Sequence, residues 1–160
     1  MFFCNLEHKI ILENVLGRYL LQINRVKNNA LIPGTWFGEP EAGIIKNQLY
    51  VRDDTPVHSA LHESCHYICM DAARRADLDS DAAGGYDEEN AVCYLQILLA
   101  DYLPGMGKQA MMNDMDDWGY TFRLGSAQSW FEEDAEDAQQ WLLNYNIIDN
   151  NNIPTWKLRQ

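Results

Sequence analysis

Residues 57–76 carry the pattern that most constrains how this chain folds. Apolar residues recur there every three or four positions, at Val57, Leu61, Cys65, Ile68 and Ala72. Such spacing predicts an amphipathic helix with one face buried in a core. Thr55 can cap this helix, and Pro56 suits its first position. Other elements of the chain must therefore cover the apolar face.

Several segments can supply that cover. Asn5 is suited to cap a helix over roughly 6–26, whose apolar residues also form a stripe. Residues 44–51 predict a strand, and 87–102 predict a second buried helix that ends before the Pro104-Gly105 pair. Further predictions are a short helix over 107–117, an extended stretch over 118–124, a last helix opened by Ser126 or Ser129, and a polar, loosely held tail from Asp149.

Composition fits one globular domain over residues 1–160. Hydrophobic residues make up 47% of the chain and charged residues 22%, which is ordinary for a protein with its own core. Together with the order of elements, this predicts an α+β fold, mostly helical, with a small β-sheet packed on the helix at 57–76. No internal repeat or linker divides the chain.

The charge and the apolar runs exclude several classes of partner. The net charge is −12, and residues 71–140 hold 16 of the 24 acidic residues but 4 of the 12 basic ones. Phosphate backbones repel such a protein, so nucleic acid is not expected as a partner. No apolar run reaches the length of a membrane span. Four cysteines without a CxxC pair, and no visible signal peptide, predict a cytoplasmic protein.

The strongest functional signal is the segment His62-Glu63-Ser64-Cys65-His66 within the helix at 57–76. Histidines four residues apart lie on one helical face, one turn from each other, so both imidazoles can reach one metal ion. Glu63 is placed to act as general base toward a water molecule. Zinc suits this donor set, which predicts Zn²⁺ as the cofactor.

A catalytic zinc ion needs a third protein ligand. No histidine follows His66, so carboxylates and thiols remain. The segment Tyr86-Asp87-Glu88-Glu89-Asn90-Ala91 opens the next buried helix. A glutamate there can present its carboxylate to the two imidazoles if this helix runs antiparallel to the first.

Here residues 43–104 resemble the gluzincins, the thermolysin-like zinc metallopeptidases. The chain is most similar to their compact single-domain members and to the peptidase domain of phage anti-repressor proteins. In those, the third ligand is a Glu followed three residues later by a small residue, as Glu88 is by Ala91. The resemblance implies that His62, His66 and Glu88 bind zinc and that Glu63 is the catalytic base.

Two positions depart from the family pattern. Glu89 competes with Glu88 for the ligand role. The family also uses a donor, often a downstream His or Tyr, that stabilises the oxyanion. No downstream histidine exists here, so Tyr120 is the candidate we assign, with Arg123 and Tyr86 as alternatives.

Other nearby residues allow competing interpretations. Residues 77–88 mimic a calcium-binding EF-hand loop, but Ala82 replaces the glycine that its sharp turn requires. His58 lies one turn before His62 and is expected to be an exposed helix residue. Cys69 and Cys93 are within reach as thiolate ligands, although core packing is the simpler role for both.

These observations predict a hydrolase, a zinc metallopeptidase that cleaves a peptide or protein substrate. Water activated at the metal attacks the peptide bond, with Glu63 as general base and Tyr120 as the oxyanion donor. The alternative is a non-catalytic zinc-site protein that acts by binding a partner. The sequence does not define an oligomeric state.

Overall fold

The computed structural model describes residues 1–160 and confirms an α+β fold that is mostly helical. The α-helices are α1 (Leu6–Leu16), α2 (Val57–Cys69), α3 (Ala72–Asp77), α4 (Tyr86–Ala100), α5 (Gly107–Trp118), α6 (Ala127–Glu133) and α7 (Glu136–Asn144). The strands are β1 (Gln22–Arg25), β2 (Gly43–Ile45) and β3 (Gln48–Val51), and two 3₁₀-helices are η1 (Gly17–Tyr19) and η2 (Arg123–Gly125). None of the helices is long and apolar enough to cross a membrane.

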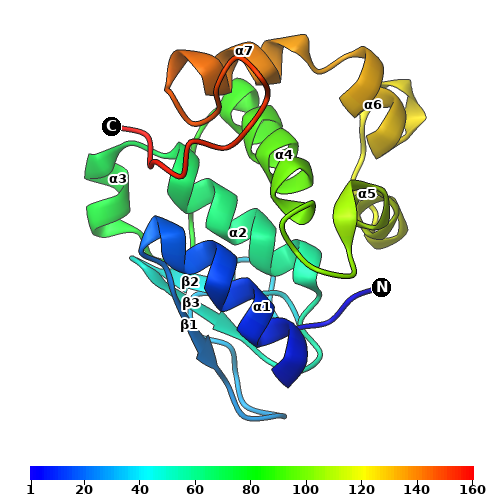
Figure 1. Ribbon diagram of the computed structural model, residues 1–160. Coiled ribbons are helices and arrows are strands. Elements are labelled where there is room, and N and C mark those ends of the chain that lie inside the picture. The colour runs from blue at the N-terminus through cyan, green and yellow to red at the C-terminus, as the bar shows by residue number, and fades with distance from the viewer.

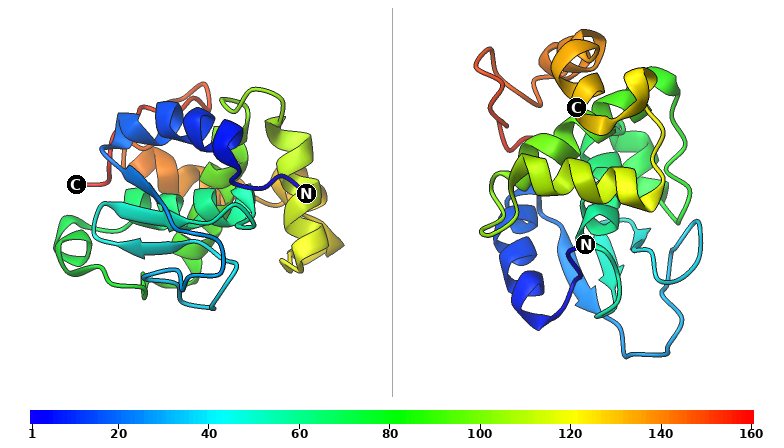
Figure 2. Two further views of the ribbon diagram at one scale, coloured as in Figure 1. Left: turned by 90° about the horizontal axis from the view of Figure 1, so that it is seen from below. Right: turned by 90° about the vertical axis from the view of Figure 1, so that its right-hand side faces the viewer.

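The sheet is small and has the strand order β1-β3-β2. β2 and β3 form an antiparallel hairpin, whereas β1 lies parallel to β3 with Gln22 opposite Gln48. Helix α1 contacts β1, and α2 contacts β2 and β3, so the sheet packs on the helix that carries the histidines. The long loop of residues 26–42 between β1 and β2 projects beyond the strands (Figure 2).

Helices α2 and α4 form the centre of the core. Every residue from Ala91 to Ala100 is buried, and in α2 only His62 is partly exposed. Helix α4 packs against α2 on one side and α7 on the other, so it lies between the sheet end of the molecule and α6 and α7, whereas α5 contacts both α2 and α4 (Figure 1). This packing brings the first turn of α4 to the middle of α2, where the histidines lie.

The predicted first helix is wrong beyond Leu16. Asn5 caps α1 as expected and accepts a hydrogen bond from the backbone N–H of His8. Leu20 then adopts a left-handed conformation with φ +63°, which ends the helical turn. Residues 22–25 pair with β3 instead, because backbone hydrogen bonds to a neighbouring strand outweigh a local helical pattern.

Three boundaries around α2 also differ from the prediction. The single strand at 44–51 is a hairpin, with a turn at Lys46 and Asn47. The helix at 57–76 breaks at Met70, which is extended, and Asp71 caps the separate helix α3. Thr55 does not cap α2, because its hydroxyl accepts a hydrogen bond from the backbone N–H of Arg52.

The C-terminal half departs from the prediction at two places. The stretch 118–124 holds no strand, and the last helix divides into α6, capped by Ser126, and α7. The tail from Asp149 was expected to be loosely held. It instead returns to the C-terminal end of α2, where the backbone N–H of Arg159 donates to the carbonyl of Ile68. This contact places Arg159 close to the first turn of α4.

Candidate metal centre

The histidines of α2 and a glutamate of α4 meet at one point. Nε2 of His62 lies 3.1 Å from Nε2 of His66, and the carboxylate of Glu89 lies 3.2 Å from each. Oε1 of Glu89 faces His62 and Oε2 faces His66, and we call the three groups the triangle. Ligand atoms about 2.05 Å from a tetrahedral zinc ion are about 3.3 Å apart, so the spacing fits that ion. This is the one group of His, Cys, Asp or Glu residues close enough together to hold a metal.

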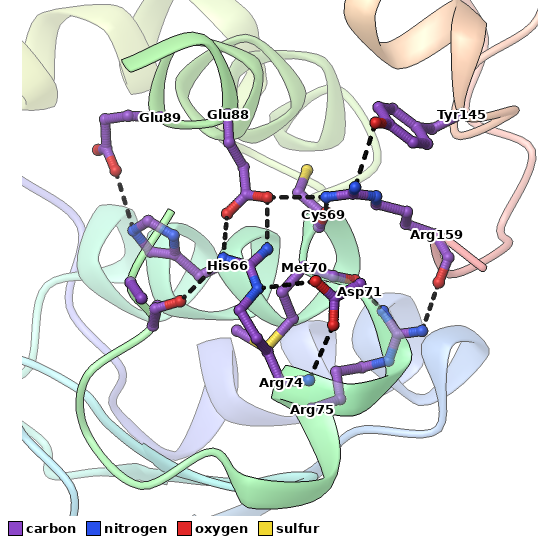
Figure 3. A network of polar contacts seen from close by, with 12 residues as sticks. His66, Cys69, Met70, Asp71, Arg74, Arg75, Glu88, Glu89, Tyr145 and Arg159 are labelled. Atoms are coloured by element: carbon purple, nitrogen blue, oxygen red, sulfur yellow. Dashed lines mark hydrogen bonds and ion pairs between the residues drawn. The ribbon is translucent and has the colours of Figure 1, made fainter. Parts of the chain in front are cut away.

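Glu88 does not take part in this group, contrary to the ligand assignment made from the family spacing. Its buried carboxylate accepts hydrogen bonds from Nη1 of Arg74 and from Nη1 of Arg159, each at 3.0 Å. Figure 3 shows Glu88 directed at these two arginines and Glu89 directed at His66. Adjacent residues of a helix point about 100° apart, so one of them faces the histidines and the other does not. Glu89 replaces Glu88 as the third member of the triangle.

The loop before α4 is shaped around Glu88. Gly84 has φ +96°, and a Cβ atom on it would lie 2.2 Å from Oε2 of Glu88. Arg74 also donates to the carbonyl of Ala82 in this loop. Glycine at position 84 is therefore required for the loop to close over the ion pairs.

Gln96 fixes the orientation of His62. Nδ1 of His62 donates to Oε1 of Gln96 at 2.9 Å, and Nε2 of Gln96 donates to the carbonyl of His58 at 3.0 Å. A proton held on Nδ1 leaves Nε2 free as a ligand atom, which is the usual arrangement of a metal-binding histidine. The sequence analysis missed Gln96, although a lone polar residue in the apolar run 91–100 was a signal for it.

The two imidazoles of the triangle differ in their protonation states. Burial and the neighbouring His62 lower the pKa of His66 to about 3, so its imidazole is neutral near pH 7. Burial opposes ionisation of Glu89, but its hydrogen bond with His62 and the two nearby imidazoles outweigh that and lower its pKa. Burial opposes protonation of His62, but Tyr120, Cys93 and Glu89 outweigh it and raise the pKa of His62 well above 6.5, so a metal ion bound there would displace a proton from His62.

Glu63 lies beside the triangle, where the base was predicted. The side chain is buried, and burial raises the pKa of Glu63 to about 7. A carboxylate with such a pKa can both accept and release a proton near neutral pH.

Of the three candidate oxyanion donors, Tyr120 is the one that the fold brings to the triangle. Its ring lies 5.6 Å from that of His62, and its hydroxyl is hydrogen-bonded to Nδ1 of His58 at 3.2 Å. Burial raises the pKa of Tyr120 to about 12, so its hydroxyl keeps its proton. Arg123 is paired with Asp134, and Tyr86 and Arg123 line a separate surface hollow.

Two hollows open on either side of the triangle and share Phe37, His62 and Glu89. We call them the Asp81 hollow and the Glu41 hollow. The Asp81 hollow, about 260 Å³, also contains Trp36, Glu63, His66, Ser80, Asp81, Ala82 and Ala83. The Glu41 hollow, about 320 Å³, also contains Glu41, Ser59, Trp118, Gly119 and Tyr120. The triangle therefore lies at the meeting point of two surface depressions, accessible from both.

The competing interpretations do not lead to a second site. The calcium loop would need Glu88, whose carboxylate is held by the two arginines. His58 is fully buried against Tyr120, so its expected exposure is wrong. Cys69 and Cys93 are buried free thiols outside the metal-binding group, as core packing predicts.

Comparison of the chain with protein-family models, curated proteins and solved structures finds no match. The geometry and chemistry of this site are thus the basis for assigning a function.

Proposed function

We propose that this protein is a zinc metallopeptidase of the gluzincin type, with His62, His66 and Glu89 as its metal ligands. The observation that supports this most directly is the triangle of two Nε2 atoms and one carboxylate, with edges of 3.1 to 3.2 Å and a buried glutamate beside it. Zinc held there would supply Lewis acidity, which polarises a carbonyl group and lowers the pKa of water. Three protein ligands leave a fourth position for chemistry.

The surrounding side chains can perform the proton transfers of peptide hydrolysis. Glu63 accepts a proton from the attacking water and delivers it to the leaving amine, a task that suits a pKa of about 7. His58 has a partner at Nδ1 and none at Nε2, which favours a proton on Nδ1, donated to the oxygen of Tyr120. The hydroxyl proton of Tyr120 then remains available for the developing oxyanion.

The two hollows support a peptide or an exposed protein segment as the substrate. An extended peptide laid across the triangle places residues from each side of the scissile bond in the Asp81 hollow and the Glu41 hollow. Both hollows are open depressions, which suits a flexible peptide or an exposed protein segment. The four cysteines are free and buried, and such thiols fit the reducing cytoplasm that we propose as its location.

Metal analysis combined with a peptide-library digest tests this function. The purified protein should hold one zinc ion and cleave peptides, with products identified by mass spectrometry. Glu63→Gln keeps the shape of the side chain but removes its basicity, so zinc should remain and the cleavage rate should fall about 100-fold or more. Equal cleavage by both proteins would disprove the role of Glu63, and zinc without cleavage of any peptide would reject the peptidase.

A non-catalytic role is the second candidate, because aromatic surface borders the site. Trp36 and Phe37 are 59% and 75% exposed on the 26–42 loop and line the hollows. Exposed aromatic side chains next to a metal centre also suit the binding of a partner protein. A zinc-loaded protein that captures a peptide without cleaving it would favour this role.

A further inference from the structure

Glu41 and Trp118 line the Glu41 hollow together with members of the triangle. Nε1 of Trp118 donates to Oε1 of Glu41 at 2.9 Å, which fixes the carboxylate at the edge of the hollow. Glu41 forms no ion pair with any lysine, arginine or histidine, and no basic residue apart from His62 lines the hollow. No ion pair within the protein therefore neutralises its carboxylate.

The other walls are aromatic. Trp118 and Phe37 are 38% and 75% exposed and line the hollow together with Tyr120. Aromatic faces attract cations and also cover the aliphatic stem of a long side chain. A carboxylate that lies between aromatic rings is suited to a lysine or arginine side chain, whose stem packs on the rings while its charged group reaches the carboxylate.

Glu41 is the carboxylate in this hollow that has no ion-pair partner and does not belong to the triangle. Glu89 also lines the hollow, but its carboxylate faces His62 and His66 and serves the metal in the proposed function. The hydroxyl of Ser59 already accepts the backbone N–H of Ala42. A positive group that enters the hollow is therefore drawn to Glu41.

We propose that the Glu41 hollow is a specificity pocket for a lysine or arginine side chain of the peptide. This inference rests on the proposed function, since the pocket is defined relative to a peptide held at the triangle. It differs from a general attraction by the acidic surface, because it assigns the preference to one carboxylate fixed by Trp118.

Binding to an inactive, zinc-loaded protein tests the pocket independently of catalysis. Calorimetry would compare three blocked peptides, acetylated and amidated at their ends, that differ at one position by Lys, norleucine or Glu. Glu63→Gln protein should bind the Lys peptide about five- to tenfold more tightly than the norleucine peptide, and the Glu peptide most weakly. Glu63→Gln/Glu41→Gln protein keeps an acceptor for Trp118 and should bind the Lys and norleucine peptides equally.

Two matched variants separate the pocket from the acidic surface. Glu63→Gln/Asp81→Asn removes a carboxylate from the other hollow, and Glu63→Gln/Glu133→Gln removes an exposed one on α6. Both should keep the preference for lysine. An equal loss in the Asp81 variant, equal binding of all three peptides, or no binding at all would overturn the pocket.

Hydrolysis by the wild-type protein is scored separately. Cleavage without any preference for lysine or arginine would support the peptidase and reject the pocket. Glu41-dependent binding of the Lys peptide without cleavage would support the pocket and reject the peptidase. Cleavage restricted to peptides with a free amino terminus would also reject side-chain recognition, because the hollow would then be reading the terminal amine.

Discussion

Glu88 and Glu89 are neighbours in the first turn of α4, yet they face different regions of the molecule. The side chain of Glu88 is 8% exposed and lies between Arg74 and Arg159, whereas that of Glu89 is 49% exposed and lies against the two histidines. Its two arginine partners neutralise the carboxylate of Glu88, so this carboxylate attracts a further cation only weakly. The carboxylate of Glu89 lies against the two imidazoles, which lower its pKa and keep it ionised.

The comparison shows how one helix turn can serve both structure and chemistry. The ion pairs of Glu88 connect α4 to α3 and to the C-terminal tail, and Arg159 also donates to the carbonyl of Cys69 at the end of α2. These contacts hold the first turn of α4, which includes Glu89, close to the histidines of α2. The carboxylate of Glu88 therefore joins separate parts of the backbone, whereas the carboxylate of Glu89 faces the proposed metal ion.

Exchange of either glutamate for alanine should separate the two roles most clearly. Glu89→Ala removes one of the three proposed metal ligands, so zinc affinity should fall more than about 100-fold. Glu88→Ala leaves the triangle intact and should weaken affinity by less than about tenfold. Competition with a fluorescent chelator measures both values, and a larger loss in Glu88→Ala would reverse the ligand assignment.

The stability of the zinc-free proteins should show the opposite order. Glu88→Ala leaves Arg74 and Arg159 without their shared carboxylate in a largely buried setting, so the free energy of unfolding should fall by about 2–3 kcal/mol. Glu89→Ala should cost less than about 1 kcal/mol, because its side chain is half exposed. Urea unfolding monitored by circular dichroism gives these numbers. Similar losses in both variants would show that the arginine pairs add little to the fold.

The loop around Glu88 can be tested with a matched pair of glycines. Gly84 and Gly38 both have φ above +90°, but a Cβ atom on Gly38 meets nothing within 4 Å. Both changes to alanine incur the same backbone strain, and Gly84→Ala adds a clash with the carboxylate of Glu88. Gly84→Ala should therefore be about 1 kcal/mol less stable than Gly38→Ala in thermal unfolding. Equal stabilities would mean that Glu88 moves aside freely.

The buried His58 should make the free energy of unfolding depend on pH. Burial and His62 lower the pKa of His58 to about 3, well below its value of about 6.5 in an unfolded chain. The unfolded state then binds more protons between these values, so His58 makes stability fall as pH drops below 6.5. Its contribution should be about 1 kcal/mol between pH 6.5 and 5.5. Urea unfolding of the zinc-free protein at pH 6.5 and 5.5 measures this slope, and His58→Gln should flatten it.

Several features of the site were already determined by the sequence. The spacing of His62 and His66 within an amphipathic helix places both imidazoles on one face, because helical geometry is local. Glu63 follows His62 directly, and the lack of a histidine after His66 left carboxylates and thiols as further donors, among them the glutamates at the start of the next buried helix. The buried helices and the small sheet follow from apolar periodicity, which reports burial directly.

The tertiary structure determined the features that local sequence patterns leave open. The choice between Glu88 and Glu89 depends on how α4 is rotated against α2, and in that packing Glu88 meets Arg74 and Arg159, the latter 71 residues further along the chain. The spacing to Ala91 carried no information about those arginines. Residues 22–25 likewise became a strand because β3 offered hydrogen-bonding partners. Contacts between distant segments have no local signature, so the third member of the triangle and the strand β1 emerged only when the chain was folded.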